Sequence, residues 1–114
     1  MGTGWREKRV EDLPHSSVEA LRTAMQLEHV PDSWFNDLAW IMAQESEGKV
    51  DVRNPGSSAR GLFQLTRVNY SLNPNGELSF GNAVDEARGG IRYIRQRYHT
   101  AQAARTFWVS HHHY

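Results

Sequence analysis

A run of apolar residues between positions 80 and 98 constrains the fold of this chain more than any other feature. Steps of four and three residues separate Phe80, Val84, Ala87, Ile91, Ile94 and Tyr98. Because this spacing places the side chains on one face of an α-helix, we predict a helix over 80–98. Gly89 and Gly90 lie inside it, where each glycine costs roughly 1 kcal/mol relative to alanine. We therefore expect another segment to pass close to the helix at these two glycines.

Two more helices are predicted in the first half of the chain. The first begins at Ser16 or Ser17, either of which can act as N-cap, and continues for about three to four turns before Pro31 stops it. The second begins after Asp32 or Ser33, again in the role of N-cap. Its apolar residues, which recur on one helical face, are Trp34, Leu38, Ile41 and Met42.

The remaining segments are predicted to be irregular, apart from one last short helix over 101–109. We interpret residues 1–14 as an N-terminal arm ahead of a domain over 15–114, because the arm is charged and has no sustained period. A turn-rich loop is predicted over 48–60, and a turn or the tip of a small hairpin within 73–82. The predicted fold class is therefore mainly α, with at most a minor β-hairpin.

The composition excludes several classes of function. Lys plus Arg and Asp plus Glu number 13 each, so the net charge is zero and a polyanion such as nucleic acid is not the expected partner. The absence of cysteine excludes thiolate metal sites and a disulfide framework. No apolar stretch approaches the roughly 18 residues of a membrane span, and the start has no apolar core of a signal peptide. We expect one monomeric domain without a metal or cofactor.

Glu45 follows the apolar face of the second predicted helix. It lies about three turns after Trp34 at 3.6 residues per turn, which places its carboxylate on the side of the core residues. A carboxylate in such surroundings loses hydration and its pKa rises, as a general acid near neutral pH requires. The alternative is a frayed final turn in which Glu45 points to solvent or pairs with an arginine.

The residues after this helix supply small polar groups. Gly56, Ser57, Ser58 and Gly61 offer main-chain N–H groups and short hydroxyls without bulk. Gln64 adds a side-chain amide that can both donate to and accept from sugar hydroxyls or acetamido groups. This combination favours a groove that binds a polysaccharide backbone near Glu45.

Several motifs resemble one known family, the lytic transglycosylase domain of the soluble, lysozyme-like type. Glu45-Ser46 at a helix end is similar to its first motif, and Ala59–Leu65 (ARGLFQL) is a variant of its second, A-x-G-L-M-Q-L. Gly90–Ile94 corresponds to G-x-x-Y-[IL], and Arg97–Tyr114 resembles the C-terminal end of the short versions found in phage and Gram-positive cell-wall proteins. The resemblance covers about residues 34–114. Arg105 and His99–Ala101 depart from that C-terminal pattern, and the motif A-Y-N-A-G of the longer enzymes is absent.

The resemblance implies a lysozyme-like α domain that cuts the β-1,4 bond between N-acetylmuramic acid and N-acetylglucosamine in peptidoglycan. Glu45 takes the place of the single catalytic acid, and Ser46 hydrogen-bonds near it. Gln64 and the Gly61 backbone line the sugar groove, and Tyr93 positions the muramoyl residue. The family's product carries a 1,6-anhydro end, and no metal or cofactor takes part. The resemblance further implies action at the bacterial cell wall, and we expect a phage-encoded or virion-associated origin.

Two other functions remain open at this stage. A hydrolytic muramidase needs a second carboxylate about 5 to 9.5 Å from the first. Asp51 is the candidate, although an Asp before Asn-Pro-Gly more often forms a turn. The other alternative is a non-catalytic glycan-binding or phage-tail structural domain.

Three side-chain groups have a structural interpretation that we prefer to a functional one. His111–His113 could bind a metal, but adjacent histidines near a chain end are more often a solvated tail. We expect an ordinary solvated face for Arg88, Arg92 and Arg95. Core packing is expected, in preference to sugar stacking, for Trp40, Phe107 and Trp108.

Overall fold

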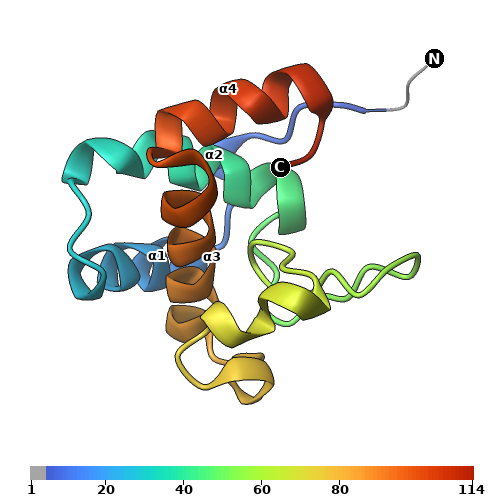
Figure 1. The fold of residues 1–114 in the computed structure, drawn as a ribbon. Helices are drawn as coiled ribbons and strands as arrows, with labels where there is room; N and C mark the ends of the chain where they lie inside the picture. The colour runs from blue at the N-terminus through green and yellow to red at the C-terminus, as the bar shows by residue number, and fades with distance from the viewer. Residues whose placement is uncertain (1–4) are drawn as a thin grey trace.

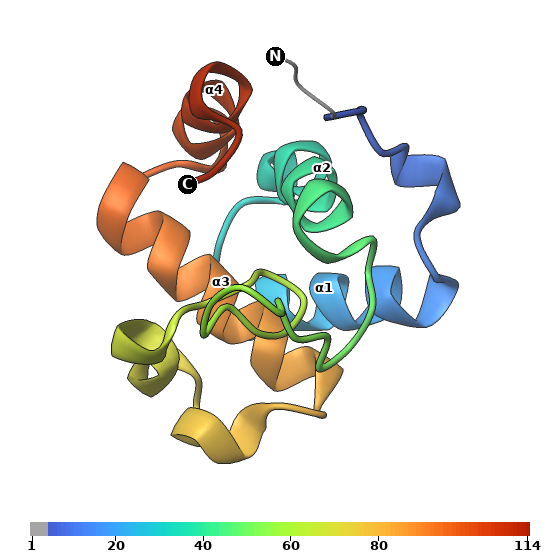
Figure 2. The same ribbon diagram turned by 90° about the vertical axis from the view of Figure 1, so that its right-hand side faces the viewer.

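The computed structural model describes residues 5–114, and over this range the protein is mainly helical, as predicted. The elements in chain order are η1 (Val10–Asp12), α1 (His15–Leu27), η2 (Asp32–Trp34), α2 (Phe35–Ser46), η3 (Arg67–Leu72), η4 (Gly76–Ser79), α3 (Ala83–Tyr98) and α4 (Ala101–His111). Helix α3 stands at the centre and packs against α1 and α4, while α2 packs against α4 (Figures 1 and 2). The long connection between α2 and α3 lies on one side of this helical bundle (Figure 1). No helix within the described range is long and apolar enough to cross a membrane.

Of the two alternatives predicted within 73–82, the turn is confirmed, since the N–H of Gly76 donates to the carbonyl of Asn73 at 3.0 Å, and the hairpin is wrong. The 3-10 helix η4 occupies this segment, because side chains satisfy the backbone locally; for example, the N–H of Asn75 donates to Ser79 Oγ at 2.8 Å. Residues 5–114 contain no named strand, but isolated antiparallel bridges pair Arg60 with Arg53 and with Leu65. The minor β character therefore lies in the preceding loop.

The predicted caps of the first two helices are also wrong. Pro14 holds the N-cap position of α1, and the buried hydroxyl of Ser17 instead donates to the carbonyl of Gly48 at 2.6 Å. Helix α2 follows the 3-10 turn η2 without any side-chain cap. In α3 the side chain of Asn82 accepts from the N–H of Asp85 at 3.0 Å, so this helix begins three residues later than the apolar period indicated.

The two glycines of α3 confirm the expected close neighbour. A Cβ on Gly90 would lie 2.3 Å from Cγ of Phe63, and one on Gly89 would lie 1.7 Å from Oδ1 of Asn73. The fully buried Phe63 ring thus rests directly on the α3 backbone. This contact fixes the segment around the predicted second motif against the helical core.

Arg88, Arg92 and Arg95 of α3 do not form an ordinary solvated face, so this prediction is wrong. Their guanidinium groups converge on the buried carboxylate of Glu28 at the C-terminal end of α1, with N–O distances of 2.8 Å from Arg88, 3.0 Å from Arg92 and 2.9 Å from Arg95. Burial opposes ionisation of Glu28, but the hydrogen bonds from the arginines outweigh it and lower its pKa to about 2. The cluster ties α1 to α3.

The described part of the predicted arm, residues 5–14, lies along α2, and residues 1–4 are outside the described range (Figure 2). Gln44 binds the arm at Lys8 through two hydrogen bonds of 2.9 Å, one to each main-chain polar group. Glu7 accepts a hydrogen bond of 2.7 Å from the indole N–H of Trp40. The arm is therefore fastened to the helix that carries Glu45.

Candidate active site

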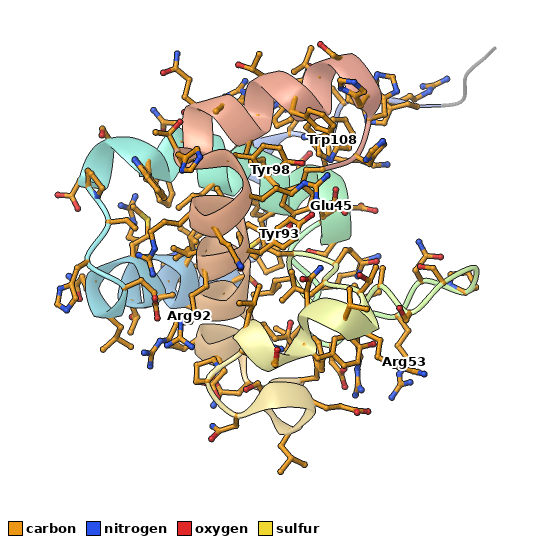
Figure 3. The ribbon with its side chains drawn as sticks, in the orientation of Figure 1. Glu45, Arg53, Arg92, Tyr93, Tyr98 and Trp108 are labelled. Atoms are coloured by element: carbon orange, nitrogen blue, oxygen red, sulfur yellow. The ribbon has the colours of Figure 1, made fainter. Side chains whose placement is uncertain are left out.

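Glu45 is the penultimate residue of α2, and its carboxylate faces α4 (Figure 3). The buried Trp108 of α4 donates its indole N–H to Glu45 Oε2 at 2.6 Å. Burial raises the pKa of Glu45 to about 7, against the opposing effect of the Trp108 hydrogen bond. Within residues 5–114 no arginine or lysine forms a salt bridge with this carboxylate. Glu45 therefore faces inward, and its raised pKa allows it to carry a proton near neutral pH.

A cleft of about 410 Å³ opens beside Glu45. Residues from the end of α2, the following loop and the C-terminal end of the chain line it: Gln44, Glu45, Asn54, Ala59, Gln64, Thr66, Trp108, His112, His113 and Tyr114. Among residues 5–114, Glu45 contributes the one acidic side chain of this lining, and its neighbours are mainly amides, a hydroxyl and aromatic or imidazole rings. Such a lining suits an uncharged ligand with many hydroxyl and amide groups.

Gln64 is the predicted substrate-binding residue that the structure places in the cleft. Its side-chain NH₂ group donates to the carbonyls of Val52 at 3.1 Å and Gly61 at 3.0 Å. These bonds fix the orientation of the amide, and its Oε1 accepts no hydrogen bond from any residue between 5 and 114. The amide therefore presents an oriented acceptor to a ligand.

Ser46 and Gly61 are close to the site in sequence but do not line the cleft. The buried hydroxyl of Ser46 donates to the carbonyl of Leu62 at 2.7 Å and accepts from the N–H of Gly48 at 3.1 Å. The N–H of Gly61 donates to the carbonyl of Val52 at 2.8 Å. The hydroxyl of Ser46 therefore holds the loop against α2, and the N–H of Gly61 holds the loop together, whereas ligand contacts were expected of both residues.

Ser57 and Ser58 likewise serve the loop itself. Ser57 Oγ accepts from the N–H of Ala59 at 3.1 Å, and Ser58 Oγ accepts from the N–H of Arg67 at 3.0 Å. A loop without strands has to satisfy its main-chain groups in this way. Neither serine is among the residues that line the cleft.

Tyr93 stands on α3 behind the cleft. Its ring packs edge-on against Tyr114, with centroids 5.1 Å apart, and burial raises its pKa. The hydroxyl of Tyr114 donates to the carbonyl of Phe63, which locks the last residue onto the second motif. Tyr93 thus supports a residue of the cleft wall and does not itself belong to the lining.

Sequence reasoning missed Glu86, a carboxylate that organises the whole loop. Glu86 is 2% exposed and accepts from the main-chain N–H groups of Asp51 at 3.0 Å, Leu62 at 2.8 Å and Gly81 at 2.8 Å. Burial raises its pKa. Gly61 adopts φ +87°, and a Cβ there would lie 2.8 Å from Glu86 Oε1. One signal was present in the sequence, because position 86 lies one turn before Gly90 on the apolar side of the helix.

The residues considered for alternative functions lie as follows. Asp51 Oδ1 pairs with Arg60 Nε at 2.6 Å, adopts φ +60° and does not line the cleft, so no second carboxylate faces Glu45 there. His111 stacks on the ring of Phe107 at a centroid distance of 3.9 Å, whereas His112 and His113 line the cleft. Between residues 5 and 114 no three His, Cys, Asp or Glu side chains form a group that could hold a metal ion.

The aromatic residues divide between core and site. Trp40 and Trp108 are buried in the core, as expected, with their rings edge to face and centroids 5.4 Å apart. Phe107 is half-buried against Tyr98. The polar end of the Trp108 indole, which reaches the carboxylate of Glu45, is the part of this cluster that the sequence analysis did not anticipate.

Comparisons with protein-family models, with curated proteins and with solved structures gave no match to this chain.

Proposed function

We propose that this protein is a lytic transglycosylase that cleaves the β-1,4 bond between N-acetylmuramic acid and N-acetylglucosamine in peptidoglycan at the bacterial cell wall. The observation that carries the proposal is the Glu45 carboxyl, held at the wall of a cleft with a pKa raised to about 7. A carboxyl of that pKa is protonated in a large fraction of molecules at neutral pH, so it can act as a general acid. The motifs that resemble the family supply the choice of substrate.

In the proposed reaction, the protonated Glu45 gives its proton to the glycosidic oxygen as the bond between C1 and this oxygen breaks. Positive charge then develops at C1 of the muramoyl residue. The C6 hydroxyl of the same sugar attacks C1, and the Glu45 carboxylate accepts the proton of that hydroxyl. The product has a 1,6-anhydro bond, and Glu45 is protonated again. One carboxylate is sufficient, which agrees with a cleft in which Glu45 is the one acidic side chain that the described residues contribute.

The rest of the cleft fits a glycan strand. The oriented oxygen of Gln64 can accept from an acetamido N–H, and Asn54 and Thr66 add further polar groups on the same wall. The hydrogen bond from Trp108 stabilises the ionised form of Glu45, which is the form that accepts the C6 proton. The same indole therefore serves the second half of the reaction.

The test is digestion of purified peptidoglycan followed by mass spectrometry of the soluble fragments. Muropeptides with 1,6-anhydro ends are the expected products, and Glu45→Gln should abolish them because the amide has no proton to transfer. Glu47→Gln, an exposed neighbour on the same segment, is the matched control and should keep parental activity. Reducing ends would replace the proposal by a hydrolytic muramidase. Equal activity of the parent and Glu45→Gln would remove the proposed role of Glu45.

The pH dependence provides an independent check of the acid role. Because the acid has to be protonated when the substrate binds, kcat/KM should fall as pH rises through about 7. A basic limb at pH 9 or above would contradict a carboxyl as the proton donor. A parent protein that binds peptidoglycan but releases no fragments at any pH would favour a glycan-binding domain.

A further inference from the structure

The N-terminal arm contacts residues of the candidate active site that the proposed reaction does not require it to contact. Trp5 packs on Trp108 with centroids 5.4 Å apart and on His112 with centroids 4.6 Å apart. The ring of His112 also stacks on Trp108 at 5.5 Å. The arm and the C-terminal end therefore enclose the one indole that donates to Glu45.

We propose that Trp5 is a positioning residue that holds the indole of Trp108 in place to donate its N–H to the carboxylate of Glu45. This inference rests on the proposed function for its catalytic consequence. Residues 5–8 of the arm are thereby part of the active-site structure.

Two further contacts keep the arm in register with the site. Glu7 accepts from the indole N–H of Trp40, whose ring in turn meets Trp108 edge to face at 5.4 Å. Gln44, the residue before Glu45, exchanges two hydrogen bonds with the backbone of Lys8. Trp108, Trp40 and the last turn of α2 are thus each bound to a residue of the arm, namely Trp5, Glu7 and Lys8.

The exposure of Trp5 supports a local role in place of a contribution to the core. Trp5 is 41% exposed, whereas Trp108 is 4% exposed. A residue that covers one side of a buried indole restricts its rotation and keeps water away from its hydrogen bond. Without Trp5, one face of the Trp108 ring loses its neighbour while the core beneath it is unchanged.

The test uses the full chain with ¹⁵N-labelled tryptophan, followed by NMR from pH 5 to pH 9 without substrate. In the parent, the indole N–H resonance of Trp108 should shift with a midpoint of about 7, the pKa of the acceptor Glu45. The ring of His112 stacks on the same indole, so this contact is a second source of a change in the resonance. Glu45→Gln separates the two sources, because the part that disappears in this variant belongs to Glu45.

Trp5→Ala should lose at least half of the Glu45-dependent shift, and Trp5→Phe, which retains a ring, should keep most of it. Arg6→Ala is the matched control, because Arg6 is exposed and forms no hydrogen bond or ion pair within residues 5–114. It should keep the full shift. Far-UV circular dichroism verifies that each variant folds. A full parental shift in Trp5→Ala would overturn the inference.

Activity gives the second measurement. Displacement of a catalytic carboxyl's partner lowers turnover more than binding, so Trp5→Ala should reduce kcat by about tenfold or more and change KM less than about twofold. The NMR result stands without any activity, so it separates the two proposals. Loss of the shift in Trp5→Ala, in a protein whose parent releases no anhydro fragments, supports the positioning role and refutes the transglycosylase. If the parent digests peptidoglycan to anhydro fragments but the shift is unchanged in Trp5→Ala, the transglycosylase is supported and the positioning role of Trp5 is refuted.

Discussion

Replacement of Glu45 by glutamine should make the protein more stable at high pH, because the parent keeps this carboxyl in an unfavourable environment. In the folded chain burial raises the pKa of Glu45 from 4.5 to about 7. The unfolded chain therefore releases this proton at lower pH than the folded chain does, and ionisation favours unfolding. The resulting cost to the folded state is absent below pH 4.5, grows between pH 4.5 and 7, and is constant above pH 7.

The size of this cost follows from the two pKa values. The difference between 4.5 and about 7 corresponds to a cost of about 3 kcal/mol in the free energy of unfolding. Glutamine has nearly the same shape, carries no charge and keeps a carbonyl oxygen for the indole of Trp108. Because Glu45 is partly accessible from the cleft, we expect Glu45→Gln to gain about 2 kcal/mol at pH 8 and close to nothing at pH 4.

Urea unfolding at pH 4, 6 and 8 measures this gain, with far-UV circular dichroism as the signal because Trp108 fluorescence would respond to the substitution itself. Glu47→Gln is again the matched control, and its stability relative to the parent should not change with pH in the same way. A gain for Glu45→Gln that is equal at pH 4 and pH 8 would refute the reasoning. The carboxyl would then ionise as readily in the folded chain as in water.

Three further predictions concern single contacts. Trp108→Phe removes the donor that lowers the pKa of Glu45, so the basic limb of the activity profile should move to higher pH, and a limb that moves to lower pH would contradict the assigned hydrogen bond. Glu28→Gln leaves three converging guanidinium groups without their anion and should lower the free energy of unfolding by about 3 kcal/mol at pH 7. In the parent this stabilisation is present above pH 4.5 and is lost as pH falls toward 2. An equal effect of the variant on urea unfolding at pH 7 and pH 2 would therefore argue against the assigned ion pairs. Gly90→Ala places a methyl group against the Phe63 ring and should destabilise the protein by about 1 to 3 kcal/mol in urea unfolding, whereas an unchanged midpoint would show that the loop can move aside.

The sequence was sufficient where a local period decided the structure. The apolar face of α3 followed from helical spacing, and the need for a small residue at Gly90 followed from the helix-propensity cost of glycine. The position of Glu45 near the end of α2 followed in the same way, whereas its inward direction was one of two alternatives that the spacing left open. These features depend on neighbours within a few turns, which a sequence displays directly.

The sequence was insufficient where partners lie far apart along the chain. Trp108 is 63 residues from Glu45, and Arg88 is 60 residues from Glu28, so neither pairing has a local pattern. Arg88, Arg92 and Arg95 therefore looked like solvated charges although they neutralise a buried carboxylate. No local pattern could reveal that Trp5 would reach the far end of the chain either.

The roles of the loop residues could not be predicted from the sequence for a different reason. Glycines, serines and amides are equally suited to bind a ligand and to complete the hydrogen bonds of an irregular backbone. A connection without strands has to complete its main-chain hydrogen bonds before it can bind a ligand. The hydroxyls of Ser46, Ser57 and Ser58 all make such bonds to the main chain. Composition identified the segment that borders the cleft, but only the three-dimensional arrangement distinguishes Gln64, which lines the cleft, from the neighbouring residues that do not.

The position of Glu86 also has a consequence for protein engineering. It fastens both ends of the segment between Asp51 and Leu62, while the tip around Pro55 stays exposed. Longer inserts grafted at that tip would carry a small closure penalty, since this entropy grows only slowly with loop length. Chimeric variants could thus carry an additional segment at this tip while the carboxyl of Glu45 keeps its position and its contacts.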